Sequence, residues 1–191
     1  MKRLPLILAS SSPRRAAFLR ELGFSFRRVA PEVDETRLRG ESPMKYVSRL
    51  AATKANAVAE RYPGRWVVGA DTAVVVNGKL LGKPSDRRDA ARMLKLLSGR
   101  SHRVFSGIGL ARDRVLHVAT SSTRVVFRPL TADVIQWYVR TGEPMDKAGA
   151  YGIQGKGGLL VARIEGSFSN VAGFPLERFF ELWKDAGLPL P

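Results

Sequence analysis

The sequence predicts a mixed α/β fold, in which helices accompany a sheet that contains antiparallel hairpins. Apolar runs with the two-residue period of strands alternate along the chain with amphipathic runs of helical period. The dipeptide Asn77-Gly78 separates two short apolar runs, which is a strong signal for a tight hairpin turn. Neither G-x-x-x-x-G-K-S/T nor G-x-G-x-x-G occurs, and the elements do not follow a regular βαβ repeat, so a Rossmann or P-loop fold is not expected.

The first part of the chain predicts two strands and two helices before the hairpin. In order, these are a strand at residues 5–9, a helix at 13–22, a strand at 24–29, an acidic loop at 31–41 and a helix at 42–62. Pro13 is pre-organised for the first turn of its helix, and we expect the preceding Ser12 to cap it. The second helix begins at Ser42-Pro43 and is rich in alanine.

The remaining elements are bounded by turn and capping residues. They are a strand at 66–70 that runs into Asp71, hairpin strands at 73–76 and 79–81, a helix at 85–99, strands around 101–111 and 115–127, a helix at 131–140, a glycine-rich segment at 149–158, a strand at 159–164 and a helix at 175–184. Asp86 and Thr131 are suitable N-cap residues for their helices, and Gly99 ends the first of these two.

Length and composition favour a single domain, with two lobes as an alternative, that binds an anion. The 191 residues are enough to bury a sizeable core. Cysteine is absent and there are two histidines, so any divalent ion would be held by carboxylates, which favours Mg²⁺ or Mn²⁺. The net charge of +15 favours an anionic partner without choosing between a nucleotide and a polymer. No signal peptide or membrane-spanning stretch is expected, and we predict a cytoplasmic protein.

Residues 10–15, Ser-Ser-Ser-Pro-Arg-Arg, link the first predicted strand to the first predicted helix. The start of a helix offers backbone N–H groups, to which this turn adds the hydroxyls of Ser10 and Ser11 and the guanidinium groups of Arg14 and Arg15. These groups suit a phosphate. The alternative is an ordinary capped helix with two solvated arginines.

Asp71 follows an apolar strand, and we expect it at the carboxyl end of that strand. Such a position suits metal binding or proton abstraction in an α/β protein, although a turn or capping role is an alternative. The hairpin folds back after Asn77-Gly78, so Lys83 is expected to return near Asp71 and to meet a phosphate. A solvated loop lysine is the alternative for Lys83.

Further charged residues lie in the acidic loop and on the alanine-rich helix. A carboxylate from Glu32, Asp34 or Glu35 near Asp71 would let two carboxylates hold one Mg²⁺ ion, whereas a solvated loop is the alternative. Arg49 and Lys54 lie on the helix, where solvation at the surface is the default expectation and one cation at a buried edge is the alternative.

The glycine-rich segment contains polar residues that suit a nucleobase. Its glycines, at positions 149, 152 and 155, let the backbone approach a ligand closely. The Gln154 amide has a donor and an acceptor, as the edge of a base requires, and Tyr151 would stack on a base or fill the core. His102 and His117 lie in predicted strands, where packing is a better explanation than catalysis.

Together these segments resemble the Maf family of nucleoside triphosphate pyrophosphatases over nearly the whole chain. Six stretches carry the resemblance: LASSSPRR at 8–15, GADT at 69–72, GKP at 82–84, LSG at 97–99 followed by His102, DKAGAYGIQG at 146–155 and GSFSNVAGFPL at 166–176. The resemblance implies a two-lobed, strongly twisted sheet flanked by helices, like that of inosine triphosphate pyrophosphatases, with a cleft between the lobes. It also implies metal-dependent hydrolysis of a nucleoside triphosphate to the monophosphate and pyrophosphate.

The resemblance also implies roles for individual residues. By position, Asp71 matches the proton acceptor, and Arg14, Thr72 and Gln154 match the specificity positions. Glu35 and Asp71 are expected to hold a Mg²⁺ or Mn²⁺ ion. The remaining expected substrate-binding residues are Ser10, Ser11, Arg15, Lys54, Lys83 and Lys147.

The stretch at residues 147–155 resembles the branch of the family that hydrolyses dTTP and UTP. The branch that acts on 7-methyl-GTP lacks Gln154 and is one alternative, and modified pyrimidine nucleotides are another class of substrate. A basic regulator of septum formation that binds nucleic acid without hydrolysis is an alternative of a different kind. A homodimer is expected from the resemblance, whereas a membrane or nucleic-acid partner is not.

Overall fold

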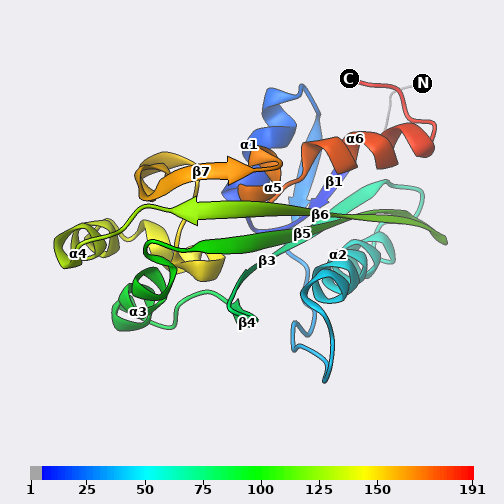
Figure 1. The fold of residues 1–191 in the computed structure, drawn as a ribbon. Coiled ribbons are helices and arrows are strands. Elements are labelled where there is room, and N and C mark those ends of the chain that lie inside the picture. Colours follow the sequence, from blue (N-terminus) through cyan, green and yellow to red (C-terminus); the bar gives the residue numbers. More distant parts are fainter. Residues whose placement is uncertain (1–5) are drawn as a thin grey trace. The chain divides into compact units, whose positions relative to one another are not determined.

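A twisted seven-stranded sheet forms the centre of the computed structural model, which describes residues 6–191 (Figure 1). The strand order is β2-β1-β3-β5-β6-β7, and β4 pairs with β3. The strands are β1 (Leu6–Ala9), β2 (Phe26–Val29), β3 (Val67–Val76), β4 (Lys79–Leu81), β5 (Ser101–Arg112), β6 (Val115–Phe127) and β7 (Val161–Glu165). Helices flank the sheet, so the expected mixed α/β class is confirmed. Residue 5 of the expected first strand lies outside the described residues.

The helices agree with the sequence prediction within a few residues. They are α1 (Pro13–Glu21), α2 (Pro43–Ala59), α3 (Arg87–Leu97), α4 (Ala132–Arg140), α5 (Phe168–Val171) and α6 (Leu176–Asp185), with 3₁₀ turns η1 (Glu143–Asp146), η2 (Ala148–Ala150) and η3 (Gly155–Leu160). The short helix α5 was not predicted. Ser12 does stand at the N-cap position of α1, but its side chain makes no capping hydrogen bond, which corrects the expected cap. Its own N–H instead donates to the Ser10 hydroxyl over 3.1 Å.

The expected hairpin is confirmed, but its first strand is longer than predicted. Val74 pairs with Leu81 in antiparallel register, and the turn residue Asn77 has the positive φ of 49° that such a turn requires. The two predicted strands at 66–70 and 73–76 are one continuous strand, β3, so Asp71 lies inside this strand rather than at its carboxyl end.

Contacts between residues divide the chain into two units, and the division falls inside β3, β5 and β6. The first unit contains the described part of Met1–Asp71 together with Ser106–Ser121 and Gly173–Pro191, and the second contains Thr72–Phe105 and Ser122–Ala172.

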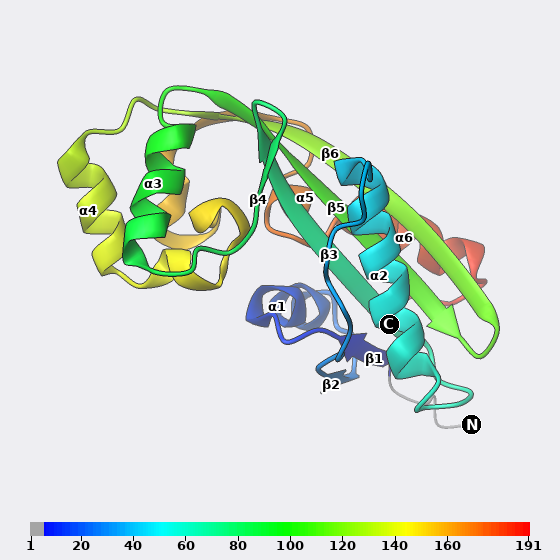
Figure 2. The ribbon, with the colours of Figure 1, turned by 90° about the horizontal axis from the view of Figure 1, so that it is seen from below.

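In the first unit, helix α2 lies on one face of the sheet and α6 on the other (Figures 1 and 2). Glycines allow α2 to approach the strands closely. A Cβ atom on Gly69 would lie 2.7 Å from the carbonyl oxygen of Ala51, and one on Gly107 would collide with the backbone of Val47. Beside α6, the ring of Phe18 from α1 stacks on Phe174 at 6.3 Å. The close packing of α2 on the strands fixes this helix, which carries Lys54.

In the second unit, α3, α4 and the 3₁₀ turns enclose a core to which β3, β5 and β6 also contribute. Tyr138, Tyr151 and Phe127 are among its buried aromatic side chains, and Tyr151 packs edge-on against Phe127 at 4.7 Å. The glycine-rich segment thus belongs to a packed region rather than to an open loop.

No helix formed by residues 6–191 has the length and apolar character that crossing a membrane requires.

Candidate active site

A chain of three charged side chains lies in the first unit, with Lys54 at its centre. The Lys54 Nζ atom is 2.6 Å from Asp71 Oδ1 and 2.7 Å from Glu35 Oε1. Lys54 and Asp71 are each only 7% exposed, whereas the Glu35 side chain is 56% exposed. The sequence prediction that these three residues act at one site is thus consistent with their geometry, although Lys54 is a buried ion-pair partner and not the solvated helix residue that was the default expectation.

The position of Asp71 follows from the different lengths of the neighbouring strands. β1 pairs with β3 in parallel, and the last paired residues are Ala9 and Gly69. β1 ends there, while β3 continues, so Asp71 lies two residues beyond the end of its neighbour. Asp71 therefore lies within β3, at a point where the neighbouring strand β1 has already ended.

The environment of Asp71 affects its proton affinity in opposing ways. Burial raises the pKa of Asp71, while the charge and hydrogen bond of Lys54 and the charge of Arg15 act to lower it. The balance is a pKa above the ordinary value for aspartate. A carboxylate that binds a proton more readily is a better general base than an ordinary aspartate.

The serine–arginine turn lies next to Asp71 through the contacts of Arg15. The guanidinium group donates from Nη1 to the Ala70 carbonyl over 2.8 Å and to the Ser10 hydroxyl over 3.1 Å. Its Nε atom donates to the Gly173 carbonyl over 2.9 Å. The Ser10 oxygen also accepts from the backbone of Ser12, so its own O–H remains a donor for a ligand. The expected convergence of the turn and Asp71 is therefore found within one unit.

One cation near this turn was not predicted. Arg28, on β2, donates from Nη2 to the Ser11 carbonyl over 2.5 Å. The parallel register places Arg28 opposite Leu8, directly before the turn. Only the strand pairing brings Arg28 to this position, so no local pattern in the sequence could have indicated it.

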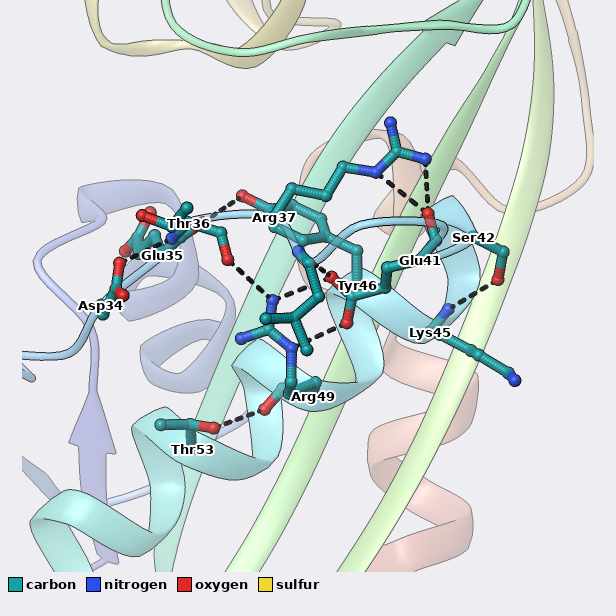
Figure 3. Close-up of polar contacts among 11 residues, drawn as sticks. Asp34, Glu35, Thr36, Arg37, Glu41, Ser42, Lys45, Tyr46, Arg49 and Thr53 are labelled. Carbon is teal, nitrogen blue, oxygen red and sulfur yellow. Dashed lines mark hydrogen bonds and ion pairs between the residues drawn. The ribbon is translucent and has the colours of Figure 1, made fainter.

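The acidic loop is attached to α2 by two residues that the sequence analysis did not assign to the site (Figure 3). Arg49 forms a two-pronged ion pair with Glu41, with Nε 2.7 Å from Oε1 and Nη2 2.9 Å from Oε2. The Tyr46 hydroxyl donates to the Glu35 carbonyl over 3.0 Å. The side chain of Asp34 accepts from Thr36 N–H over 2.8 Å and so shapes the loop, while the neighbouring Glu35 reaches Lys54.

Arg14, a further predicted site residue, is the second residue of α1 in the first unit. The other predicted site residues belong to the second unit. Thr72 follows Asp71 directly, and Lys83 is exposed two residues after the end of β4. Gln154 is half-buried at the start of η3. The Lys147 ammonium lies 2.6 Å from Asp146 Oδ1 and 2.5 Å from the Glu143 carbonyl, contacts that hold the loop itself.

The segment around Gln154 is organised by Glu143, which the sequence analysis also missed. One Glu143 carboxylate oxygen accepts from the Tyr138 hydroxyl over 2.9 Å and from Gly157 N–H over 3.0 Å. The other accepts from Lys156 N–H over 3.2 Å. The two N–H bonds fix the backbone on the carboxyl side of Gln154, because Lys156 and Gly157 follow it within three residues.

His102 is a packing residue, as expected from the sequence. It is 3% exposed, and its Nε2 atom lies 2.7 Å from the Tyr151 hydroxyl. Burial lowers the pKa of His102 to about 4. A histidine that remains neutral inside the core is unsuited to proton transfer at neutral pH.

The donor set is compatible with a hard divalent cation that is shared with a ligand. No group of three or more Asp, Glu or His side chains among residues 6–191 could hold a metal ion by itself. The carboxylates of Asp71 and Glu35 nevertheless reach the same atom, Lys54 Nζ, so they could reach the same cation. One or two carboxylates completed by substrate phosphates is the usual arrangement for Mg²⁺.

Comparison with known proteins shows the family of the chain. The chain matches the Maf family, described as Maf-like protein, over residues 5–186. A dTTP/UTP pyrophosphatase of Symbiobacterium thermophilum is 54% identical over 185 residues, which cover 97% of this chain and 95% of the relative. Another, from Salmonella typhimurium, is 49% identical over 178 residues, covering 93% and 90% of the two chains.

Solved structures support the fold. A HAM1 protein from Coxiella burnetii has a TM-score of 0.55 at 15% identity and covers 96% of this chain and 100% of its own. A Ham1 protein from Staphylococcus aureus has a TM-score of 0.53 at 13% identity, covering 96% and 97%. Because the family match and the similarity to the relatives extend over nearly the full length, the chain belongs to the Maf family.

Proposed function

We propose that this protein hydrolyses dTTP and UTP to the monophosphate and pyrophosphate, with Asp71 as the proton acceptor. The observation that carries the proposal is the buried Asp71 carboxylate, which Lys54 holds by an ion pair beside the Ser10–Arg15 contact. Relatives that are 46–54% identical carry the name dTTP/UTP pyrophosphatase, which supports the choice of substrate.

In the proposed reaction, a water molecule attacks the α-phosphorus. A bond forms between the water oxygen and phosphorus, the bond from the α-phosphorus to the bridging oxygen breaks, and pyrophosphate leaves with the electron pair. Asp71 accepts the proton of the water. Its raised pKa and its fixed position on β3 suit this role, since such transfers depend mainly on positioning and charge.

Basic and hydroxyl side chains would bind the triphosphate. Arg14, Arg15, Lys54 and Lys83 would neutralise its charge, and Ser10 and Ser11 would donate hydrogen bonds. Lys147 retains its expected substrate role only through the loop, because its ammonium already lies on Glu143 and Asp146. A Mg²⁺ or Mn²⁺ ion held by Glu35 and Asp71 would supply further positive charge against the phosphates.

Gln154 and Thr72 would recognise the pyrimidine. A pocket that tolerates a methyl group accepts both uracil and thymine, because one methyl changes binding by only about 1–3 kcal/mol. Modified pyrimidines with a small 5-substituent are therefore further expected substrates. A homodimer remains a prediction from the family resemblance, and a cytoplasmic location remains a prediction from the sequence.

The test is a substrate panel with the purified protein and Mg²⁺ or Mn²⁺. It contains dTTP, UTP, 5-methyl-UTP, dCTP, GTP and 7-methyl-GTP, and both pyrophosphate and the monophosphate are quantified. We expect pyrophosphate from dTTP, UTP and 5-methyl-UTP, with ¹⁸O from labelled water in the monophosphate. A preference for 7-methyl-GTP, label in the pyrophosphate, or no hydrolysis of any triphosphate would overturn the proposal.

A further inference from the structure

The feature that carries this inference is the attachment of the acidic loop, residues 31–41, to helix α2. The loop contains no helix or strand, and its residues from 34 to 40 are exposed. Glu41, at its end, is nevertheless only 8% exposed although it carries a charge. Hydrogen bonding to Arg49 is the main reason that the pKa of Glu41 falls to about 2, so the pair is ionised at neutral pH.

Glu41 and Arg49 organise the loop from opposite sides. Within the loop, Glu41 Oε2 accepts from Leu38 N–H over 3.1 Å, and the Arg37 guanidinium donates to the Glu41 carbonyl. From α2, Arg49 bonds both carboxylate oxygens of Glu41 through Nε and Nη2 (Figure 3). The Nη2 atom also donates to the Thr36 carbonyl over 3.0 Å. The guanidinium group thus joins two points of the loop to the helix.

Tyr46 contributes a third attachment point beside Arg49. Its hydroxyl donates to the Glu35 carbonyl, and its ring lies 5.8 Å from the Arg49 guanidinium carbon. Burial and the negative charges of Asp71 and Glu35 raise the pKa of Tyr46, so the hydroxyl keeps the proton that it donates. The carbonyl groups of Glu35 and Thr36 are consecutive, so the backbone on the carboxyl side of Glu35 is held twice.

This attachment determines where the Glu35 carboxylate lies. An exposed glutamate on an irregular loop loses conformational freedom when its position is fixed, and this costs free energy unless other contacts hold the loop. Lys54, the partner of the Glu35 carboxylate, lies on the same helix as Tyr46 and Arg49. Helix α2 therefore holds the backbone of residues 35 and 36 and also contacts the side chain of Glu35 through Lys54.

We propose that Arg49 is a positioning residue, which holds the acidic loop on α2 and thereby keeps the Glu35 carboxylate at the Lys54–Asp71 pair. The catalytic part of this inference depends on the proposed function; the attachment of the loop does not. The planar guanidinium group of Arg49 bonds both oxygens of Glu41 and the Thr36 carbonyl together. A lysine ammonium is a point charge without this fork, so Arg49→Lys keeps the charge and removes the geometry.

The first experiment measures the loop directly, without any substrate. Hydrogen–deuterium exchange of the full chain is compared between wild type, Arg49→Lys and the control Arg92→Lys, which alters an exposed arginine–aspartate pair on α3. We expect exchange in residues 31–41 to be at least tenfold faster in Arg49→Lys only, with β3 and the rest of α2 unchanged. Wild-type exchange in this loop of Arg49→Lys, or equal acceleration over the whole chain, would overturn the proposal.

The second experiment asks whether Arg49 acts through Glu35. Loss of a residue that orients a metal-binding or catalytic carboxylate typically costs about 10–100-fold in activity or metal affinity. We expect Arg49→Lys to lose dTTP hydrolysis in this range, and to cause no further loss when Glu35 is already replaced in Glu35→Ala. Equal, independent losses in the double variant would contradict action through Glu35. If the wild-type protein hydrolyses no triphosphate, the proposed function fails, and the exchange experiment alone decides on the loop attachment.

Discussion

The Lys54 ammonium lies 2.6 Å from the Asp71 carboxylate, and each residue is only 7% exposed. Glu35 approaches the same ammonium from the exposed side. The Lys54 ammonium therefore forms ion pairs with a buried carboxylate and with an exposed one.

Replacing Asp71 tests its role in the reaction. Asp71→Asn keeps the shape of the side chain but removes the group that accepts the proton. We expect the turnover of dTTP to fall by about 10²–10⁴-fold, the usual contribution of a positioned base. Turnover is measured as pyrophosphate release at saturating dTTP, and circular dichroism confirms that the variant is folded. Near-normal turnover would refute the assignment of Asp71.

Replacing Lys54 tests the ion pair as a contribution to stability. Lys54→Met leaves the Asp71 charge buried without its closest partner, and removal of one member of a buried pair typically destabilises a protein by about 3–5 kcal/mol. Asp71→Asn should cost less, because Lys54 keeps Glu35 as a partner. Urea unfolding at pH 7 measures both free energies. The interpretation fails if Asp71→Asn is the less stable of the two variants.

Replacing Gln154 tests recognition of the base. Gln154→Ala removes the amide but leaves the Glu143 contacts that fix the following backbone. We expect kcat/KM to fall for dTTP and UTP and to change less for dCTP and GTP. Leu159→Ala, at a 67% exposed position on the same segment, is the matched control and should retain the selectivity. Equal losses for every base would show that Gln154 does not contact the base.

His102 predicts a dependence of stability on pH. Burial lowers its pKa from 6.5 to about 4 in the folded protein, so between these values the unfolded chain binds a proton that the folded chain does not. The contribution of His102 to stability must therefore fall as the pH decreases through this range. From pH 7 to pH 5 the contribution is about 2 kcal/mol, since each unit of pKa difference corresponds to roughly 1.4 kcal/mol.

The measurement is urea unfolding of wild type and His102→Gln at both pH values. The variant lacks the titrating group, so its loss of stability on acidification should be smaller by the same amount. Titration of the His102 ring by NMR gives the folded-state pKa independently, with only two histidines to assign. Parallel pH dependences in the two proteins, or a folded-state pKa near 6.5, would contradict the burial argument.

The sequence was sufficient where short segments bring functional groups together. The turn at residues 10–15 and the neighbourhood of Asp71 were expected at one site, and Arg15 joins them through Ser10 and the Ala70 carbonyl. The hairpin at Asn77-Gly78 was also predicted correctly, because the turn type depends on these two residues alone.

The sequence was insufficient where a partner comes from a distant or irregular segment. The pairing of Arg49 with Glu41 crosses from a helix into a loop, for which no periodic spacing exists. Arg28 reaches Ser11 only through the pairing of β2 with β1. The continuity of β3 was missed because two polar residues interrupt an apolar run, and only the ion pair with Lys54 explains how the strand accommodates Asp71.

The glycines that face α2 limit which positions of this enzyme can be substituted. Gly69 and Gly107 leave no room for a methyl group against the backbone of the helix. Any side chain there would push α2 outward and carry Lys54 away from its carboxylates, whichever nucleobase is bound. Under the proposed role of Gln154, directed evolution toward a different base would vary the segment around that residue, whereas Gly69 and Gly107 would have to stay glycine for every substrate.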